Sequence, residues 1–583
     1  MQTAAVRHRP ESEDCYLVTT ETMKLRLHTG RDVKAVYVHY CDVHEPMTNL
    51  KKQAMDLAGH GQVNDYWETT VTLPLHRAQY VFEIHGEDGE EWVYGDRGFR
   101  KNEKESYEDR NNYFKLPYFH AVDMTKCPDW VMETVWYQIF PDRFANGDKS
   151  NDPEGVKDWN PSDHPGREDY YGGDLQGVLD HLDYLQDLGI NGLYFCPIFK
   201  ASSNHKYDTI DYLEIDPDFG DKQLFARLVN EAHARGMKVM LDAVFNHMGD
   251  SSMQWQDVVE NGPNSRFANW FHSNRLPVEP YDPADPSYET FAFEKHMPKL
   301  NTANPEVVDY LLTIATYWVK QFDIDAWRLD VADEVDHQFW KKFKAAVTAI
   351  KPDFYVLGES WHSSQSSLNG DEFSGTMNYP FTGQIADHFL KGTQDAKTMT
   401  ELLTDQLFLY REQSNSAMLN VLDSHDTARI KTVAGEDEDK ALQALAFTFM
   451  QTGSPCIYYG TEMGMSGDND PDCRKPMDWS QAGSPVWQAV QAIIAFRRHH
   501  WEILSKGQTW LEVEENGLIH VKRTGWLEFE ESGLIHVKQT RKGTIEGWFN
   551  TTGQAVSLSA EATLSRGYEA GQLASKGYVL SVK

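Results

Sequence analysis

Short apolar segments alternate with longer helical stretches from Trp130 to about residue 500, and this alternation constrains the fold more than any other feature of the sequence. Such a pattern is typical of a parallel sheet whose strands are joined by crossover helices. Eight strand candidates lie along this region: Val135–Phe140, Gly192–Phe199, Lys238–Phe245, Ile324–Leu329, Tyr355–Gly358, Gly375–Met377, Met418–Leu422 and Cys456–Tyr459. Eight such units predict an α/β fold of the (β/α)8 TIM barrel type.

The segment between the third and fourth strand candidates is too long for a single helix. Residues 248–300 are rich in Pro, Asn, Asp and aromatic residues, which favours an irregular unit. We therefore expect a subdomain inserted after the third strand.

The two ends of the chain have the two-residue alternation of β-strands instead. In the N-terminal part it covers Tyr16–Leu27, Val33–Tyr40, Tyr66–Leu73 and Gln79–Ile84, and it returns after about Trp501. We predict an N-terminal β-sandwich over residues 1–122, a barrel domain over 123–500 and a C-terminal β-sandwich over 501–583.

The C-terminal part contains a tandem repeat. Residues 510–524 are nearly copied as residues 526–540, with twelve of fifteen positions identical at a spacing of sixteen. Each copy has the pattern strand, Asn-Gly or Ser-Gly turn, strand, which predicts a β-hairpin. Two copies are too few for a repeat architecture, so we interpret them as a local duplication.

Charged residues end four of the apolar strands. Asp242 ends the third, Arg328 and Asp330 the fourth, Glu359 the fifth, and the seventh runs into His425-Asp426. A single aspartate at a strand end is usually a turn former or a helix cap. Since catalytic residues of barrel enzymes lie where strands end, and since buried charges are costly unless paired, four charged strand ends together favour a functional cluster.

These strand ends resemble the signature regions of the α-amylase superfamily, glycoside hydrolase family 13. The resemblance rests on Asp242-Ala-Val-Phe-Asn-His247, Asp325-Ala-Trp-Arg-Leu-Asp330, Gly358-Glu-Ser-Trp-His362 and Leu422-Asp-Ser-His-Asp426, which occur in the family's order. Met297-Pro-Lys-Leu-Asn301 is similar to a fifth region of the neopullulanase, cyclomaltodextrinase and maltogenic amylase group, which also has an N-terminal β-sandwich. Ser360 departs from this group, where an aliphatic residue is more usual.

The resemblance implies a retaining α-glucan hydrolase. Asp330 would be the nucleophile, Glu359 the general acid and base, and Asp426 the third carboxylate, which binds sugar hydroxyls. The implied substrate-binding residues are His247, Arg328, His425, Tyr207, Asp242 and Trp361, of which Asp242 would support Arg328 and Tyr207 would stack on the sugar. For Trp361, ordinary packing is about as good an interpretation as a sugar platform.

A further cluster of oxygen-bearing residues follows the first strand. Asn146, Asp148, Asn151 and Asp152 lie within seven residues, followed by Gly172 and Asp174. Alone, the cluster is typical of a turn, but calcium requires six to eight oxygen ligands, which such a cluster offers. It resembles the calcium loop of the same group, so a structural Ca2+ ion is expected.

The charge balance bears on partners. With 55 Lys and Arg against 89 Asp and Glu, the formal net charge is −34, which disfavours nucleic acid and anionic membranes and suits a neutral α-glucan. The N-terminus lacks the apolar core of a signal peptide, so a cytoplasmic protein is expected. The resembled group further implies a homodimer in which the N-terminal domain covers the partner's barrel.

Alternatives remain at this point. A non-catalytic barrel that serves as an interaction subunit is disfavoured because all three carboxylates are present. A carbohydrate-binding or scaffold protein is a second non-enzyme hypothesis. Among enzymes, an α-glucosidase or a mainly transglycosylating enzyme is the alternative to hydrolysis of cyclodextrins, pullulan, maltodextrins and starch through α-1,4 or α-1,6 bonds.

Overall fold

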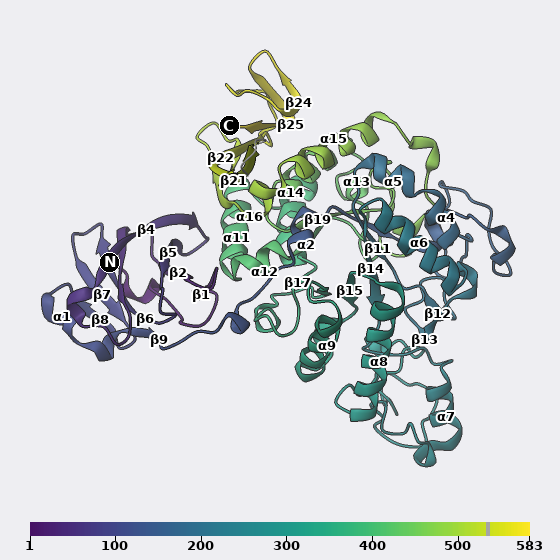
Figure 1. The fold of residues 1–583 in the computed structure, drawn as a ribbon. Coiled ribbons are helices and arrows are strands. Elements are labelled where there is room, and N and C mark those ends of the chain that lie inside the picture. Colours follow the sequence, from purple (N-terminus) through teal and green to yellow (C-terminus); the bar gives the residue numbers. More distant parts are fainter. Residues whose placement is uncertain (532–536) are drawn as a thin grey trace.

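The structure is a computed structural model that describes the backbone of residues 1–531 and 537–583, and the side chains of residues 1–525 and 543–583. Figure 1 shows an N-terminal β-domain beside a central barrel and a C-terminal β-sheet packed on the barrel's helices. Among the helices described, none is both long enough and apolar enough to cross a bilayer.

The central domain is the predicted eight-stranded parallel barrel. Its strands are β10 (Trp136–Ile139), β11 (Gly192–Phe195), β14 (Lys238–Ala243), β15 (Ala326–Leu329), β16 (Tyr355–Gly358), β17 (Gly375–Thr376), β18 (Leu419–Val421) and β19 (Ser454–Tyr458). A parallel bridge between Met377 and Leu419 closes the barrel between β17 and β18. All eight predicted strands are confirmed.

Helices surround the barrel and bury one apolar face against it. They are α2 (Asp129–Glu133), α3 (Pro141–Phe144), α4 (Leu175–Asp180), α5 (Leu182–Leu188), α6 (Lys222–Ala234), α8 (Pro305–Phe322), α9 (His337–Ile350), α10 (Tyr379–Ile385), α11 (Ala396–Phe408), α12 (Glu412–Ser416), α13 (Ile430–Val433), α14 (Glu438–Phe449), α15 (Pro485–His499) and α16 (Trp501–Lys506). A short hairpin, β12 (Phe199–Ala201) and β13 (Thr209–Ile215), follows β11 and carries the loop with Tyr207.

The predicted insertion follows β14. It contains α7 (Met253–Asn261) and is tied together by isolated bridges such as Ser273–Tyr288 and Thr290–Pro298. A bridge between His247 and Lys299 joins its two ends at the barrel rim. The insertion therefore lies at the strand ends where the candidate site residues meet.

The N-terminal domain is an antiparallel β-domain. Its strands are β1 (Cys15–Leu17), β2 (Thr22–Thr29), β3 (Val33–Cys41), β4 (Lys51–His60), β5 (Asp65–Thr72), β6 (Ala78–Gly86), β7 (Glu91–Gly95), β8 (Gly98–Lys101) and β9 (Phe114–Leu116), with a short helix α1 (Lys104–Glu108). The prediction of one strand over Tyr16–Leu27 was wrong, because β1 and β2 pair with each other across a turn. The turn is stabilised by a hydrogen bond between the hydroxyls of Thr19 and Thr22 and by one from the Glu21 N–H to the Thr19 hydroxyl. It contains no glycine or aspartate, so no turn signal separates β1 from β2 in the sequence.

The C-terminal part is an antiparallel sheet of β20 (Gln508–Val513), β21 (Ile519–Glu531), β22 (Val537–Phe549), β23 (Val556–Ser557), β24 (Leu564–Glu569) and β25 (Gln572–Val582). The first repeat forms the predicted hairpin of β20 and β21. The second repeat extends the β21–β22 ladder from the Thr524–Thr544 pair to the Glu531–Val537 pair, and its predicted turn lies outside the described residues.

Candidate active site

The strand register explains why the charged strand ends meet. Asp242 pairs with Arg328 across β14 and β15, and Leu329 pairs with Gly358 across β15 and β16. Because side chains alternate along a strand, Arg328 and Asp330 point the same way, and the next residue pair in register is Asp330 with Glu359. The sequence pattern therefore places these side chains on the inner face of the barrel at its carboxyl end.

Arg328 is fully buried and gathers three carboxylates. Its Nη1 atom donates to both carboxylate oxygens of Asp242, at 3.0 and 2.9 Å, and to Oδ1 of Asp330 at 2.6 Å. Its Nη2 atom lies 2.9 Å from Oε2 of Glu359 as an ion pair. Asp242 therefore pairs with Arg328, and Asp330 and Glu359 contact the same guanidinium group.

Glu359 accepts hydrogen bonds at both carboxylate oxygens. The backbone N–H of Val331 donates to Oε2 at 2.8 Å, and the indole N–H of Trp361 donates to Oε1 at 3.2 Å. Val331 has a φ of 46°, a left-handed conformation that is an outlier for a β-branched residue. The turn after Asp330 therefore stores backbone strain while it aims an N–H group at Glu359.

Burial among like charges shifts the protonation of this cluster. Burial raises the pKa of Asp330 well above its ordinary value, with Glu359 and Asp242 adding to the effect and Arg328 opposing it. Burial likewise raises the pKa of Asp242 to about 6, again against Arg328. Asp330 and Asp242, which share the Nη1 atom of Arg328, therefore titrate together.

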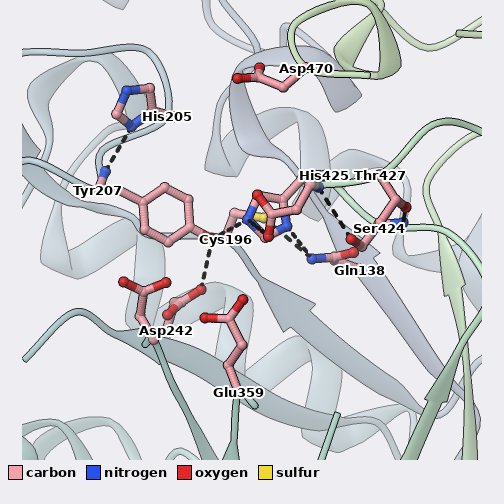
Figure 2. Close-up of polar contacts among 12 residues, drawn as sticks. Gln138, Cys196, His205, Tyr207, Asp242, Glu359, Ser424, His425, Thr427 and Asp470 are labelled. Atoms are coloured by element: carbon pink, nitrogen blue, oxygen red, sulfur yellow. Dashed lines mark hydrogen bonds and ion pairs between the residues drawn. The ribbon is translucent and has the colours of Figure 1, made fainter. Parts of the chain in front are cut away.

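A hydrogen-bonded chain crosses the site above this cluster. Gln138 Nε2 donates to Nδ1 of His425 at 2.8 Å, His425 Nε2 lies 2.5 Å from the Tyr207 hydroxyl, and that hydroxyl donates to Asp242 at 3.0 Å. Since Nδ1 accepts, the proton of a neutral His425 is on Nε2. Burial, with Arg474 and Arg328 nearby, lowers the pKa of His425 well below its ordinary value, in keeping with this neutral ring. Figure 2 shows Asp242 and Glu359 rising from the strand ends toward Tyr207 and His425.

The other predicted substrate-binding residues border the same space. The Asp426 carboxylate lies 3.1 Å from His425 Nε2, and His247 Nε2 lies 3.2 Å from the Tyr207 carbonyl oxygen. Burial lowers the pKa of His247 to about 3, so this ring is neutral. Trp361 is 51% exposed and stacks on Tyr379 with 3.8 Å between ring centroids, which leaves an aromatic face open beside Glu359.

Several residues of this site were missed in the sequence. Gln138 donates to His425, and Tyr379 stacks on Trp361. Arg474 donates to the His425 carbonyl at 2.8 Å and lies 3.5 Å from the Asp426 carboxylate. Lys206 precedes Tyr207 in a left-handed conformation with φ 62°, and its buried ammonium pairs with Asp216 at 2.9 Å and Asp218 at 3.1 Å. Of these residues, only Gln138 could have been suspected from the sequence, because it is a polar residue inside an otherwise apolar strand.

The predicted calcium residues converge on one loop. The buried amide oxygens of Asn146 and Asn151 accept no hydrogen bond from the residues that the structure describes. Asn146 Nδ2 donates to Asp152 at 2.6 Å, and a Cβ atom at Gly172 would lie 2.4 Å from the Asp152 carboxylate. These residues fit a cation, because buried oxygens without donors are otherwise costly.

The two remaining aspartates of the predicted calcium set have other partners. Asp174 accepts from the backbone N–H groups of Gly147, Asp148 and Gly177 at 3.0, 2.8 and 2.6 Å, and thereby caps α4 and shapes the loop. The exposed Asp148 carboxylate accepts from Ser150. Asn146, Asp152 and Gly172 thus lie against one another, and Asn151 Nδ2 donates to Asp174 at 3.3 Å.

A TIM barrel whose strand ends hold three carboxylates on one buried arginine, beside an aromatic ring and neutral histidines, has the features of a glycoside hydrolase. Comparison with known families agrees. The profile described as "Alpha amylase, catalytic domain" matches residues 138–509, and "Alpha amylase, N-terminal ig-like domain" matches residues 1–120. The chain belongs to the α-amylase family, in its group of maltogenic amylases, cyclomaltodextrinases and neopullulanases.

Individual relatives match over most of their length. An intracellular maltogenic amylase of Bacillus subtilis is 46% identical over 532 residues, 90% of this chain and 89% of the relative. Neopullulanase 2 of Thermoactinomyces vulgaris is 40% identical over 527 residues, 89% of this chain and 88% of the relative. A solved cyclomaltodextrinase structure superposes with a TM-score of 0.88 at 39% identity, over 100% of this chain and 98% of that chain.

Proposed function

We propose that the chain hydrolyses α-glucans with retention of configuration, with Asp330 as nucleophile and Glu359 as general acid and base. The observation that carries the proposal is the placement of both carboxylates on Arg328, at 2.6 and 2.9 Å. Retention requires a nucleophile and an acid close together on opposite sides of the scissile bond. The names of the relatives support cyclodextrins, pullulan, maltodextrins and starch as substrates.

In this mechanism, Asp330 attacks the anomeric carbon and forms a glycosyl ester. Glu359 donates its proton to the glycosidic oxygen as that bond breaks, and then accepts a proton from the water that hydrolyses the ester. Asp426, His425 and His247 would hydrogen-bond the sugar hydroxyls, and Tyr207 would stack on the same sugar. Arg328 would fix the two reacting carboxylates relative to each other.

The stereochemical outcome tests the proposed chemistry. Freshly cleaved product should carry the α-anomer, and proton NMR during the first minutes with maltotriose would show it before mutarotation. Early accumulation of the β-anomer would contradict retention. Parallel product analysis with β-cyclodextrin, pullulan and soluble starch would rank the substrates and separate hydrolysis from glucosidase action or transglycosylation.

We further propose a structural calcium ion held by Asn146, Asn151, Asp152 and Gly172, with Asp148 and Asp174 as the remaining predicted ligands. An ion that binds the folded loop alone stabilises it, so a chelator should lower the melting temperature by roughly 5 °C. Differential scanning fluorimetry with added chelator, and with excess calcium restored, measures this shift. Asn151→Ala should remove the sensitivity to chelator, whereas Asp158→Ala should keep it because the Asp158 side chain is exposed. A wild-type melt that ignores the chelator would contradict the proposal.

A homodimer through the N-terminal domain is the corresponding proposal for assembly. Strands β7 and β8 and helix α1 lie on the side of that domain away from its own barrel, where a second chain could contact it (Figure 1). A specific dimer should show twice the chain mass in light scattering, unchanged on dilution through the micromolar range. A monomer at all concentrations would contradict it.

The name of the Bacillus subtilis relative supports action inside the cell.

A further inference from the structure

The N-terminal domain is joined to its own barrel by a buried charged contact. Arg26 of β2 is 4% exposed, pairs with Glu68 of β5 and donates to the backbone carbonyl of Tyr410, between α11 and α12. Its guanidinium carbon lies 5.2 and 5.0 Å from the ring centroids of Tyr16 and Phe408. A buried arginine with fixed hydrogen bonds and two aromatic neighbours holds the two domains in one orientation.

More contacts on both sides of Arg26 support the same orientation. Lys24 pairs with Glu412 at 3.1 Å, and Gln413 donates to the Leu17 carbonyl at 2.7 Å. Tyr66 donates to Asp405 at 2.6 Å and stacks on Phe408. The domain interface therefore runs along the end of α11 and the start of α12.

This interface reaches the loop that follows β16 and begins with Glu359. The hydroxyl of Tyr410, a residue only 4% exposed, accepts from the backbone N–H of Ser364 at 3.2 Å. Gln365 Nε2 donates directly to Glu13 of the N-terminal domain at 3.0 Å. The loop is thus bonded to the N-terminal domain once directly and once through Tyr410.

The bonded part of the loop is continuous with the acid. The Ser364 hydroxyl donates to the His362 carbonyl at 3.2 Å, and His362 pairs with Asp333 at 3.0 Å. Trp361, between His362 and Ser360, donates its indole N–H to Glu359. The position of the N-terminal domain is therefore linked to the orientation of the Glu359 carboxyl group. The link runs through four residues of this loop: Trp361, His362, Ser364 and Gln365.

We propose that the N-terminal domain of the same chain, acting through the positioning residues Tyr410 and Gln365, holds the loop that orients Glu359 toward the glycosidic oxygen. The inference rests on the proposed role of Glu359 as general acid. It assigns the domain a task within its own chain, separate from any contact with a partner's barrel.

Leaving-group chemistry isolates this effect. A sugar leaving group needs a proton from the acid as the glycosidic bond breaks, whereas fluoride leaves an α-glycosyl fluoride without one. A disordered acid loop should therefore slow the first step with maltotriose but not with α-maltosyl fluoride. Since kcat/KM reports on the steps up to the first irreversible bond cleavage, it is the quantity to compare.

The experiment uses the full chain with Tyr410→Phe, Gln365→Met and their combination. Both changes keep the side-chain volume and remove only the hydrogen bond to the loop or to Glu13. Tyr113→Phe is the matched control, because Tyr113 is a buried tyrosine of the N-terminal domain whose hydroxyl donates to the Tyr107 carbonyl at 3.0 Å, away from the barrel.

In the double variant, kcat/KM for maltotriose should fall about fivefold or more while that for α-maltosyl fluoride stays within about twofold. The control should change neither. Equal falls with both substrates, or unchanged maltotriose cleavage, would overturn the inference. Wild-type turnover of maltotriose is measured in the same series, and its absence would count against the proposed function itself.

Discussion

Asp330→Asn should abolish turnover and leave the fold intact. The amide has the size of the carboxylate but cannot form a glycosyl ester, so kcat should fall on the order of 10⁴-fold or more. Burial raises the pKa of Asp330, and the neighbouring carboxylates of Glu359 and Asp242 add to this effect. Replacing the Asp330 carboxylate by a neutral amide therefore removes a buried charge and its repulsion with these two groups. The melting temperature should therefore stay the same or rise, as scanning fluorimetry would show alongside initial rates on maltotriose.

Asp323→Asn is the matched control for this experiment. Asp323 precedes the same strand at the opposite end of the barrel and is 72% exposed, and asparagine tolerates its left-handed φ of 57°. Its turnover should equal that of the wild type. Residual activity of Asp330→Asn above about a hundredth of the wild-type rate, in contaminant-free protein, would show that another group is the nucleophile.

Asp325→Asn should lower the free energy of unfolding more than Asp330→Asn or Asp323→Asn. The Asp325 side chain is 1% exposed and its carboxylate pairs with His233 at 2.8 Å, Lys238 at 3.0 Å and Lys351 at 2.8 Å. Removing one partner of a buried charge network costs about 3 kcal/mol at the low end of its range. The low end applies because the three cations are 26, 33 and 18% exposed and water can partly resolvate them. Asp323→Asn again serves as the control, with little change expected.

Lowering the pH should remove the stabilisation that the ionised Asp325 carboxylate provides. Burial alone would raise the pKa of Asp325, but the hydrogen bonds from His233 and Lys351 outweigh it, and the pKa is lowered below its ordinary value. A carboxyl group with a lowered pKa stabilises the fold fully above its unfolded pKa of about 3.9, and this contribution is lost as the pH falls toward the folded pKa. Melting curves of wild type and Asp325→Asn should therefore converge below about pH 4. A constant difference down to pH 2 would contradict this account.

The barrel and its reacting groups were predictable because they depend on local pattern and one topological rule. The apolar strands are short and separated by helices, and parallel strands bring their carboxyl ends to one edge, so Asp330, Glu359 and Asp426 could be placed together. The even spacing of Arg328 and Asp330 also fixed their common direction.

Contacts between distant loops were not predictable in the same way. Arg474 follows β19 by sixteen residues and reaches His425 through a loop with no periodic signal. Lys206 depends on the hairpin of β12 and β13, which brings Asp216 and Asp218 to it from beyond the turn. The break between β1 and β2 was hidden because its turn uses threonine hydroxyls.

The β21–β22 ladder contains the second repeat without disturbing the strand pairs that precede it. Residues 525–540 lie between Thr524 and its partner Thr544, so that pair and the pairs before it along the ladder do not depend on the added segment. Excising residues 525–540 would join Thr524 to Arg541 and leave Thr524 opposite Thr544. The three residues between them, Arg541-Lys542-Gly543, place glycine where a three-residue hairpin loop requires the left-handed conformation. A chain shorter by one copy would therefore close the same sheet with a three-residue turn.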